Sequence, residues 1–554
     1  MEKQNASVKV AEKKEDIMNL VKGEGPWQRK ILLVIMLIAV PLASHNLAMS
    51  FFAPNLDHWC ARPPGSNLSV EEWKDLALPP HDRHCSRYKF IYFTDHGKEF
   101  FTNFTSSEVV PCDSWEYDDS IYVSSVLSEW NLVCDREWFI SLSKSIFIAG
   151  YMCSVTVFGF LADKFGRRPI VAACNVIALI AAIICACSTS FFMFAIARFF
   201  IAVGVSGAFN TAFVLLMEII GPEYRSKYGL IVNLGWNFGY ISLPGVARLL
   251  RDWFWIQLFI TVPNILLLST WWLLPESPRW LLTHGKVDLA LEVLSKAGKT
   301  NGINFEDVKF KVEEAISKTS KEHENENASA NVLQLLKPGL WKTTLIIFYN
   351  WCVIAFVYYG ISYNTNELAG DPFLNFALYG LIEIPANILS LFAIQYKGRR
   401  NPTAITLAAA GASCLLIYFI PDDPWWLGVS LSLFGKFCIS CAFGIIYVFT
   451  AEIFPTIVRN VGLGSASVSA RVGSIIAPFV RELGKATHPV VPQIFFGILA
   501  AIGGFLVLFL PETNNCSVPD TFKDMAEISR KGHPDKKTET VLALQEVDKK
   551  ELTE

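Results

Sequence analysis

Residues 159–168 read GFLADKFGRR and stand between two long apolar runs, residues 138–161 and 169–187. The charges fall where one apolar helix must end and the next begin, so the stretch predicts a tight turn between two membrane-spanning helices. Basic residues in a short loop place that loop on the cytoplasmic side of a membrane. The basic residues of this turn are Lys164, Arg167 and Arg168.

The other small and polar residues of the turn suit the same role. Gly159 and Gly166 permit close approach of the backbone to its neighbours. Asp163 can cap a helix start or pair with an arginine. The alternative is a generic basic turn between two membrane helices.

The composition is that of a membrane protein. Of the 554 residues, 52% are hydrophobic and 18% are charged, and the mean hydropathy is +0.35. Long uncharged runs supply the roughly 20 apolar residues that a spanning helix needs. The first run, residues 31–52, is too long for a signal-peptide core and lacks an A-x-A-like cleavage site behind it. We therefore expect an uncleaved first span.

The composition also argues against several classes of function. A net charge of −3, with no basic patch interleaved with aromatics, argues against a nucleic-acid partner. The sequence shows no nucleotide-binding loop, metal-ligand cluster or nucleophile–base arrangement. We predict neither an enzyme nor a site for a cofactor or a metal.

We predict an all-α membrane protein with twelve spanning helices in two halves of six. The expected spans are residues 29–52, 139–162, 169–188, 191–217, 226–247, 253–274, 341–363, 372–396, 401–420, 425–452, 458–480 and 489–511. The expected parts are an N-terminal tail (1–28), a first half (29–274) with a large extracellular loop (53–138), a cytoplasmic loop (275–340), a second half (341–511) and a C-terminal tail (512–554).

The charges of the short loops set the orientation. Lysines and arginines recur on one side of the expected spans, whereas the acidic loop at residues 421–424 falls on the other side. This bias predicts that both tails lie in the cytoplasm. The N-terminal tail is rich in lysine and glutamate and poor in apolar residues, so we expect it to be mobile.

The two halves repeat three features in the same order, at shifts of 232, 234 and 236 residues. The repeated features are Gly166-Arg167-Arg168 with Gly398-Arg399-Arg400, Glu218 and Arg225 with Glu452 and Arg459, and Pro275-Glu276-Ser277 with Pro511-Glu512-Thr513. Three repeats in order indicate an internal duplication. Parallel repeats of membrane helices predict a substrate site at the midplane between the halves.

The predicted extracellular loop carries four cysteines and two N-glycosylation acceptors. The cysteines are Cys60, Cys85, Cys112 and Cys134, and the acceptors are Asn67 and Asn103. Cysteines on the outside favour two disulfides, for which the residues alone leave three connectivities open. Asn327 also lies in an acceptor sequence, but on the predicted cytoplasmic side, so we expect it to stay unmodified.

These motifs together resemble the organic cation, organic anion and carnitine transporter family of the major facilitator superfamily. Besides the turn and the large loop, the resemblance rests on EWNLVC (129–134), PESPRWL (275–281) and TAEIFPT (450–456). It covers nearly the whole chain and implies alternating access by rocking of two halves in the plasma membrane. It also implies disulfides Cys60–Cys112 and Cys85–Cys134, and a gating role for the signature residues and the repeated Glu/Arg pairs.

Charged residues within the spans are the first candidates for transport, because each costs about 2.5–3.5 kcal/mol at a helix centre unless it faces protein or water. Glu383, Lys436 and Arg471 each share a helix face with small or polar residues, so we expect them to point inward. Two interpretations of Glu383 and Lys436 stay open: a mutual ion pair, or contact with substrate. Arg198 is expected to make a structural pairing.

Aromatic residues near these charges suggest a site for an amine. Trp351, Tyr358 and Tyr447 are candidates for a cation–π cage, which would contribute about 0.5–2 kcal/mol per contact. Trp351 and Tyr358 are seven residues apart and so share a helix face, which favours exposure to a cavity. The alternative is ordinary core packing.

The eleventh span separates the subfamilies that the resemblance implies. Cation transporters of the family resemble one another in an aspartate where this chain has Arg471, so the chain is more similar to carnitine and anion members. The sodium-coupled carnitine members differ from this chain near Asn46 and Asn210, which argues against sodium as a coupling ion.

The leading hypothesis is a polyspecific carrier that moves small organic cations or zwitterions, carnitine-like, across the plasma membrane. The first alternative keeps the carrier but makes the substrate an organic anion such as a carboxylate. The second alternative, from another class, is a receptor or adaptor that kept the fold and lost transport. The intact signature and the costly charges in the spans argue against that last reading.

Overall fold

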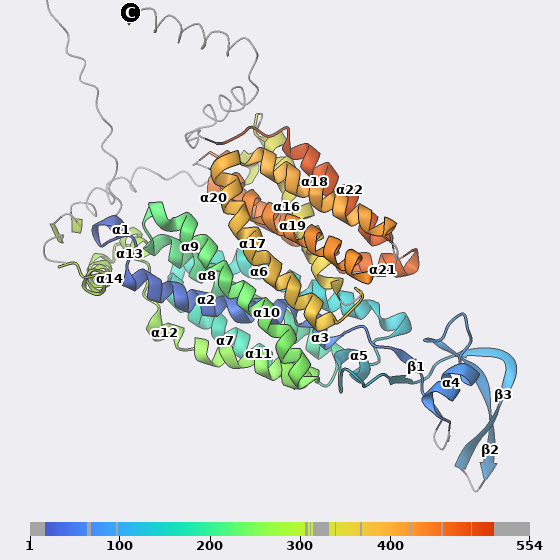
Figure 1. The fold of residues 1–554 in the computed structure, drawn as a ribbon. Coiled ribbons are helices and arrows are strands. Elements are labelled where there is room, and N and C mark those ends of the chain that lie inside the picture. Colours follow the sequence, from blue (N-terminus) through green and yellow to red (C-terminus); the bar gives the residue numbers. More distant parts are fainter. Residues whose placement is uncertain are drawn as a thin grey trace, which may run out of the picture.

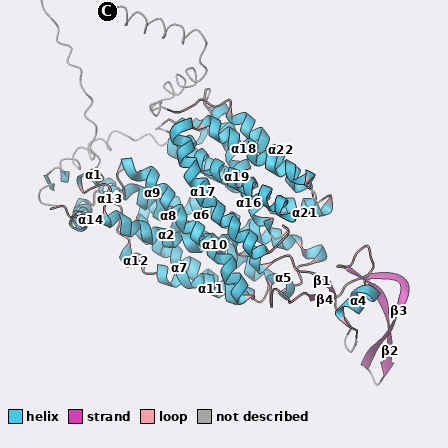
Figure 2. Ribbon diagram, viewed as in Figure 1, coloured by secondary structure: helices cyan, strands magenta, loops and turns pink. Residues whose placement is uncertain are grey.

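Helices make up most of the molecule, and a small subdomain that contains strands projects from one end (Figure 1). The computed structural model describes residues 17–63, 68–95, 98–304, 309–310, 312–313, 332–337, 339–365, 368–420, 423–455, 458–488 and 490–514. Figure 2 shows that strands occur only in the projecting subdomain among the described residues.

Two groups of helices form the body of the molecule. The first group consists of α2 (Pro26–Leu47), α3 (Met49–Phe52), α6 (Trp138–Phe165), α7 (Arg167–Ala186), α8 (Phe191–Ile219), α9 (Arg225–Ile231), α10 (Asn233–Leu250), α11 (Trp253–Leu267) and α12 (Thr270–Leu273). The second consists of α16 (Trp341–Tyr363), α17 (Pro372–Lys397), α18 (Arg400–Leu416), α19 (Trp425–Ile453), α20 (Arg459–Ile476), α21 (Phe479–Ala486) and α22 (Val491–Val507). Helices satisfy their own backbone hydrogen bonds, as the interior of a bilayer requires.

Nine helices within the described residues are long and apolar enough to cross a membrane. The remaining predicted spans, residues 226–247, 401–420 and 489–511, fall on elements that miss this standard. The first is divided between α9 and α10, while α18 and α22 have 17 residues each. The predicted span 458–480 is divided between two helices, because α20 ends at Ile476 and the separate α21 begins at Phe479.

Small residues bring the helices of each group close together. A Cβ on Gly204 of α8 would lie 2.5 Å from the backbone nitrogen of Ala178 in α7. A Cβ on Gly473 of α20 would lie 2.1 Å from the carbonyl oxygen of Cys352 in α16. Both distances are shorter than van der Waals contact, so only glycine fits at these crossings. Such close backbone approach is typical of helix packing in membranes.

The most extensive contacts between the two groups lie along two lines. α6 of the first group packs against α20 and α21 of the second, and α10 packs against α17. Figure 1 shows these crossings between the groups, in the part of the body that lies near the projecting subdomain.

The projecting subdomain is built from two antiparallel strand pairs and a short helix. Its elements are β1 (His58–Cys60), α4 (Val70–Ala77), β2 (Ser86–Asp95), β3 (Lys98–Pro111) and β4 (Trp115–Tyr117), with β1 paired to β4 and β2 paired to β3. α5 (Val126–Glu129) then leads back to the helices. The sequence analysis did not predict these strands.

Two disulfides hold the subdomain, Cys60–Cys112 and Cys85–Cys134, with Cα–Cα distances of 5.3 and 5.8 Å. This is the connectivity that the family resemblance implied. A small core of Trp59, Trp73 and their neighbours packs around the first disulfide. Asn67 lies outside the described residues, and Asn103 lies in β3, where only its backbone is described.

The part of the N-terminal segment that starts at Ile17 is packed against the protein, unlike the mobile tail that the sequence predicted. Met18 and Val21 are buried, and Asn301, after α14 (Val287–Thr300), fixes the segment. The Asn301 side chain accepts from Trp27 N at 3.0 Å and donates to Val21 O at 2.9 Å. The two apolar side chains explain the difference, because they supply buried surface that a charge count alone overlooks.

Candidate functional site

The signature turn is organised by one carboxylate from outside it. Gly166 separates α6 from α7 with φ 104° and ψ 163°. Beside it, Glu276 accepts hydrogen bonds from the backbone N–H groups of Arg167 and Arg168, at 2.8 and 3.2 Å. A Cβ on Gly166 would lie 2.5 Å from the Glu276 carboxylate. The start of α7 thus forms an anion site that Glu276 fills.

The side chain of Arg167 joins the turn to a neighbouring helix. It donates two hydrogen bonds to Glu218 of α8, at 2.8 and 3.1 Å, and forms an ion pair with Asp163 at 3.0 Å. The Asp163 side chain is 75% exposed, whereas that of Glu218 is 19% exposed. Solvent screens the Arg167–Asp163 pair more strongly, so the contact with Glu218 contributes more to holding the Arg167 side chain in place.

The second half reproduces this arrangement. Glu512 accepts from the backbone N–H groups of Arg399 and Arg400 at 2.9 and 3.1 Å, beside Gly398 with φ 84°. Arg399 donates to Glu452 at 2.8 Å, as Arg167 does to Glu218. The repeat seen in the sequence therefore has matching geometry in both copies.

Some of the proposed gating residues lie differently from expectation. A Cβ on Gly159 would meet nothing within 4 Å, so the expected close approach at Gly159 is wrong. Arg225 and Arg459 donate to carbonyl oxygens at the ends of α8 and α19, those of Met217 and Phe454. Sequence reasoning did not assign a role to Glu276 or Glu512, although the repeated Pro-Glu-Ser/Thr marked both.

Glu383 and Lys436 form an ion pair inside the second group of helices. Lys436 Nζ lies 2.9 Å from Glu383 Oε1 and donates to Ser362 Oγ at 2.7 Å. Tyr358 donates its hydroxyl hydrogen bond to the same carboxylate, and its ring centre is 3.2 Å from Lys436 Nζ. Both charged side chains are buried. In this structure the pair has the mutual arrangement that was one of the two open interpretations.

Arg471 is placed differently, because it has no carboxylate partner among the described residues. Its guanidinium carbon lies 3.9 Å from the ring centre of Tyr151 on α6, in the other group of helices. The Nε atom is buried and has no hydrogen-bond partner within the described part of the chain. Sequence reasoning named Arg471 and missed Tyr151, which lies seven residues from Lys144 and therefore on the same face of α6.

The three proposed cage aromatics differ in accessibility. Trp351 and Tyr358 are buried, at 2% and 8% exposure, so the expected exposure of these two to a cavity does not hold in this structure. Trp351 donates to Thr450 Oγ1 at 2.8 Å and its ring lies 4.9 Å from that of Tyr447. Tyr447 is 42% exposed. Of the three rings, Tyr447 is the one that a ligand can reach here.

The two candidate asparagines are not brought into one network. Asn46 donates to the hydroxyl of Tyr359 and accepts from that of Tyr363, both at 3.4 Å across the two helix groups. Asn210 donates to Ser206 O at 2.8 Å, within its own helix. Arg198, expected to be structural, donates to His45 O and lies among three phenylalanine rings.

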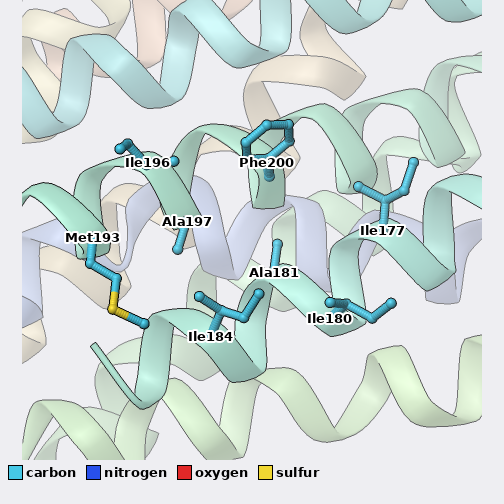
Figure 3. A pocket seen from close by; sticks show the side chains of 8 residues that line it. All are labelled: Ile177, Ile180, Ala181, Ile184, Met193, Ile196, Ala197 and Phe200. Atoms are coloured by element: carbon cyan, nitrogen blue, oxygen red, sulfur yellow. The ribbon is translucent and has the colours of Figure 1, made fainter. Parts of the chain in front are cut away.

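Two other features of the described residues can be set aside as candidate sites. His58 lies near Cys85 and Cys134 at metal-ligand spacing, but both sulfurs are joined in a disulfide and cannot act as thiolate ligands. A pocket of about 590 Å³ lies between α7 and α8, and Arg471 is not among the residues that line it (Figure 3). Its lining is wholly apolar, so it suits an acyl chain rather than an organic ion.

The sequence pattern that describes the family "Sugar (and other) transporter" matches residues 94–521. Among solved structures, the inward-open xylose transporter XylE of E. coli is similar with a TM-score of 0.61 and 15% identity, over 90% of this chain and 99% of that one. The fold is therefore that of the major facilitator superfamily, and the protein is a membrane transporter rather than an enzyme.

Curated relatives narrow the class. "Organic cation transporter protein" of Drosophila melanogaster is 37% identical over 95% of this chain and 96% of its own. "Organic cation/carnitine transporter 2" of Homo sapiens and "Organic anion transporter 3" of Sus scrofa are each 32% identical, over 92% of this chain and 93% of their own. The chain belongs to the organic cation, organic anion and carnitine transporter family of the major facilitator superfamily.

Proposed function

We propose that this protein moves small organic zwitterions or cations, carnitine-like, across the plasma membrane by alternating access. The observation that carries the proposal is the contrast between the two central cations. Lys436 is neutralised by Glu383, whereas Arg471 has an aromatic neighbour and a buried Nε without a hydrogen-bond partner among the described residues. A substrate carboxylate would supply the missing partner, because a guanidinium stays charged and favours bidentate contact with a carboxylate.

The amine end of a zwitterion would lie against aromatic rings. Tyr447 is accessible and stands beside Trp351, so these two rings support a cation–π contact. Tyr358 and the Glu383–Lys436 pair would be reached only if the helices move during the transport cycle. Asn46 belongs to the same central region through its bonds to Tyr359 and Tyr363, and Asn210 lies in α8 of the first half.

An organic anion is the second candidate substrate. Lys144 and Arg471 both face rings at the contact between the two helix groups, and no carboxylate pairs with Arg471 among the described residues. A carrier that prefers carboxylates would have this charge balance. The third candidate, a receptor without transport, is disfavoured by the intact pair of gating networks at Glu276 and Glu512.

The proposal includes the membrane arrangement. Twelve spans in two halves, residues 29–274 and 341–511, would place both termini in the cytoplasm and residues 53–138 outside. The signature residues and the Glu218–Arg167 and Glu452–Arg399 pairs would hold the cytoplasmic helix ends and release them during rocking of the halves. No sodium dependence is expected, because this chain departs from the sodium-coupled pattern near Asn46 and Asn210.

Uptake of a labelled panel tests the proposal directly. The panel is carnitine, tetraethylammonium and an aryl carboxylate, measured with and without sodium and at two pH values. Carnitine uptake without sodium dependence is the expected result. Uptake of the aryl carboxylate alone would favour the anion alternative, and uptake of none of the three with normal surface expression would contradict the proposal.

A further inference from the structure

The contact between α6 and α20–α21, here called the α6 seam, is a continuous ladder of contacts. From the outer end inward, Glu137 meets Arg481 and Lys485, and Ser141 donates to Pro478 O and Glu482. Ser145 then donates to Ile475 O at 2.6 Å, and Tyr151 lies under Arg471. Ser141, Ser145 and Tyr151 lie 4, 8 and 14 positions after Glu137, so the four residues fall on one side of the helix. The seam therefore leads from the outer surface to Arg471.

The α6 seam carries more positive than negative charge. Its cations are Arg481, Lys485, Lys144 and Arg471, and its anions within the described residues are Glu137 and Glu482. Lys144 is buried midway, over the ring of Tyr363 at 4.8 Å. Lys144 and Arg481 line the same small cavity, of about 10 Å³, together with Asn364 and Pro478. That volume is close to the least that one water molecule needs.

The other contact between the helix groups, here called the α10 seam, is balanced. At its outer end Arg248 of α10 forms an ion pair with Asp371 at the start of α17. Deeper in, Gly380 of α17 packs against Tyr240 and Ile241 of α10. One cation and one anion therefore face each other there. Deeper in, Lys436 lies 5.5 Å from the ring centre of Tyr240 and is paired with Glu383, so the charges along this seam are also matched there.

We propose that the α6 seam is the entry route for substrate carboxylates, with Lys144 and Arg481 forming a transient anion subsite above Arg471. When α6 and α21 part, Glu137 leaves Arg481 and Lys485, and a carboxylate from outside replaces it. The carboxylate then passes Lys144 and reaches Arg471. This inference rests on the proposed function, because it assumes a substrate with a carboxylate.

Charge at the seam accounts for both attraction and direction. A vestibule lined by one sign of charge raises the local concentration of the opposite ion, and low-dielectric walls strengthen that effect. Competition between Glu137 and the incoming carboxylate would also couple substrate arrival to opening of the seam. The balanced α10 seam has no such preference, so it provides the control.

Transport kinetics give the first test. Lys144→Gln and Arg481→Gln should each raise the KM for external carnitine or aryl carboxylate about three- to tenfold, and the KM for tetraethylammonium much less. Arg481→Lys should restore most of the affinity because it keeps the charge. Arg248→Gln should change the uptake of all substrates alike. Equal KM changes for carboxylate and cation in the Arg481 variant would overturn the proposal.

A second readout needs no transported substrate. Ser141→Cys places a thiol in the α6 seam, where it can react only when the seam opens, and labelling of the parent protein is subtracted. A negatively charged methanethiosulfonate reagent should label it faster than a positively charged one. The ratio of the two labelling rates does not depend on how often the seam opens, because opening affects both rates equally. This ratio should fall about tenfold in the double variant Lys144→Gln with Arg481→Gln. Arg248→Gln should leave the ratio unchanged.

The labelling separates failure of this inference from failure of the proposed function. A rate ratio near one, or one that ignores Lys144 and Arg481, overturns the entry route even if carboxylates are transported. A high rate ratio that falls in the double variant supports the anion subsite. If the parent protein shows that high ratio but takes up no carboxylate, the entry route stands and the proposed function is contradicted.

Discussion

The guanidinium carbon of Arg471 lies 3.9 Å from the ring centre of Tyr151, across the contact between the two helix groups. The buried acid Glu383 is instead paired with Lys436 at 2.9 Å. Glu383 is therefore the counter-charge of Lys436 and not of Arg471 in this structure. Arg471 lies against an aromatic face, and its buried Nε has no hydrogen-bond partner among the described residues, so it can donate to another acceptor.

Arg471 is the first residue to test. Arg471→Lys and Arg471→Ala should both reduce uptake of carboxylate-bearing substrates at least tenfold, because lysine keeps the charge but loses the bidentate fork. Tetraethylammonium uptake should be spared. Initial rates of uptake, corrected for the amount of protein at the cell surface, are the measurement. Equal losses for every substrate, recovered when Glu383 is also neutralised, would instead assign Arg471 to bracing.

Glu383 and Lys436 should depend on each other for stability. Glu383→Gln alone leaves a buried ammonium without its counter-charge, which costs about 3–5 kcal/mol. The double variant Glu383→Gln with Lys436→Met should recover much of that loss, since neither charge then remains buried. Thermal unfolding of the detergent-purified protein measures both effects. Tyr358→Phe is the control that removes a hydrogen bond to Glu383 and leaves the ion pair. A double variant less stable than either single one would contradict the pairing.

The two signature glycines should respond very differently to alanine. Gly166→Ala places a Cβ 2.5 Å from Glu276 in a backbone conformation open essentially to glycine alone, at a cost of about 1–3 kcal/mol. Gly159→Ala meets nothing within 4 Å and should be nearly neutral. Surface expression and thermal unfolding of the matched pair give the comparison. Equal tolerance at both positions would show that Glu276 does not constrain the turn.

Asp163 should affect transport rate more than substrate affinity. Its side chain is exposed and pairs with Arg167 within the signature turn, and neither residue contacts Arg471. Asp163→Asn is expected to lower maximal uptake several-fold with little change in KM, because we propose that the turn gates the helix ends and is not part of the substrate site. Concentration series of uptake at matched surface expression provide the measurement. A large rise in KM with unchanged maximal uptake would contradict the gating role.

Glycosylation tests the orientation. Asn67→Gln together with Asn103→Gln should remove all N-linked glycan, because the predicted topology places only the loop at residues 53–138 in the lumen of the secretory pathway. The mass shift on enzymatic deglycosylation is the measurement, with each single variant as a control for partial loss. A glycan that persists in the double variant and disappears with Asn327→Gln would reverse the predicted topology.

The local sequence determined much of this protein. Long apolar runs form helices in a bilayer, because a helix satisfies all the backbone hydrogen bonds of a segment without water. The turn at 159–168 and the repeat of Gly-Arg-Arg, Glu and Pro-Glu are short-range patterns, and their geometry in the two halves matches that repeat. The resemblance likewise anticipated both disulfides.

Only the tertiary structure decided which charges meet. Glu383, Lys436 and Arg471 lie on three different helices, and helix periodicity gives the face of each residue but not its partner across an interface. The structure pairs the first two and sets Arg471 against Tyr151, a residue from the other half of the chain that no local pattern distinguished. It likewise buried Trp351 and Tyr358, left Tyr447 accessible and brought Glu137 to Arg481 and Lys485. These outcomes depend on how two packed helix groups fit together, which is a property of long-range contacts.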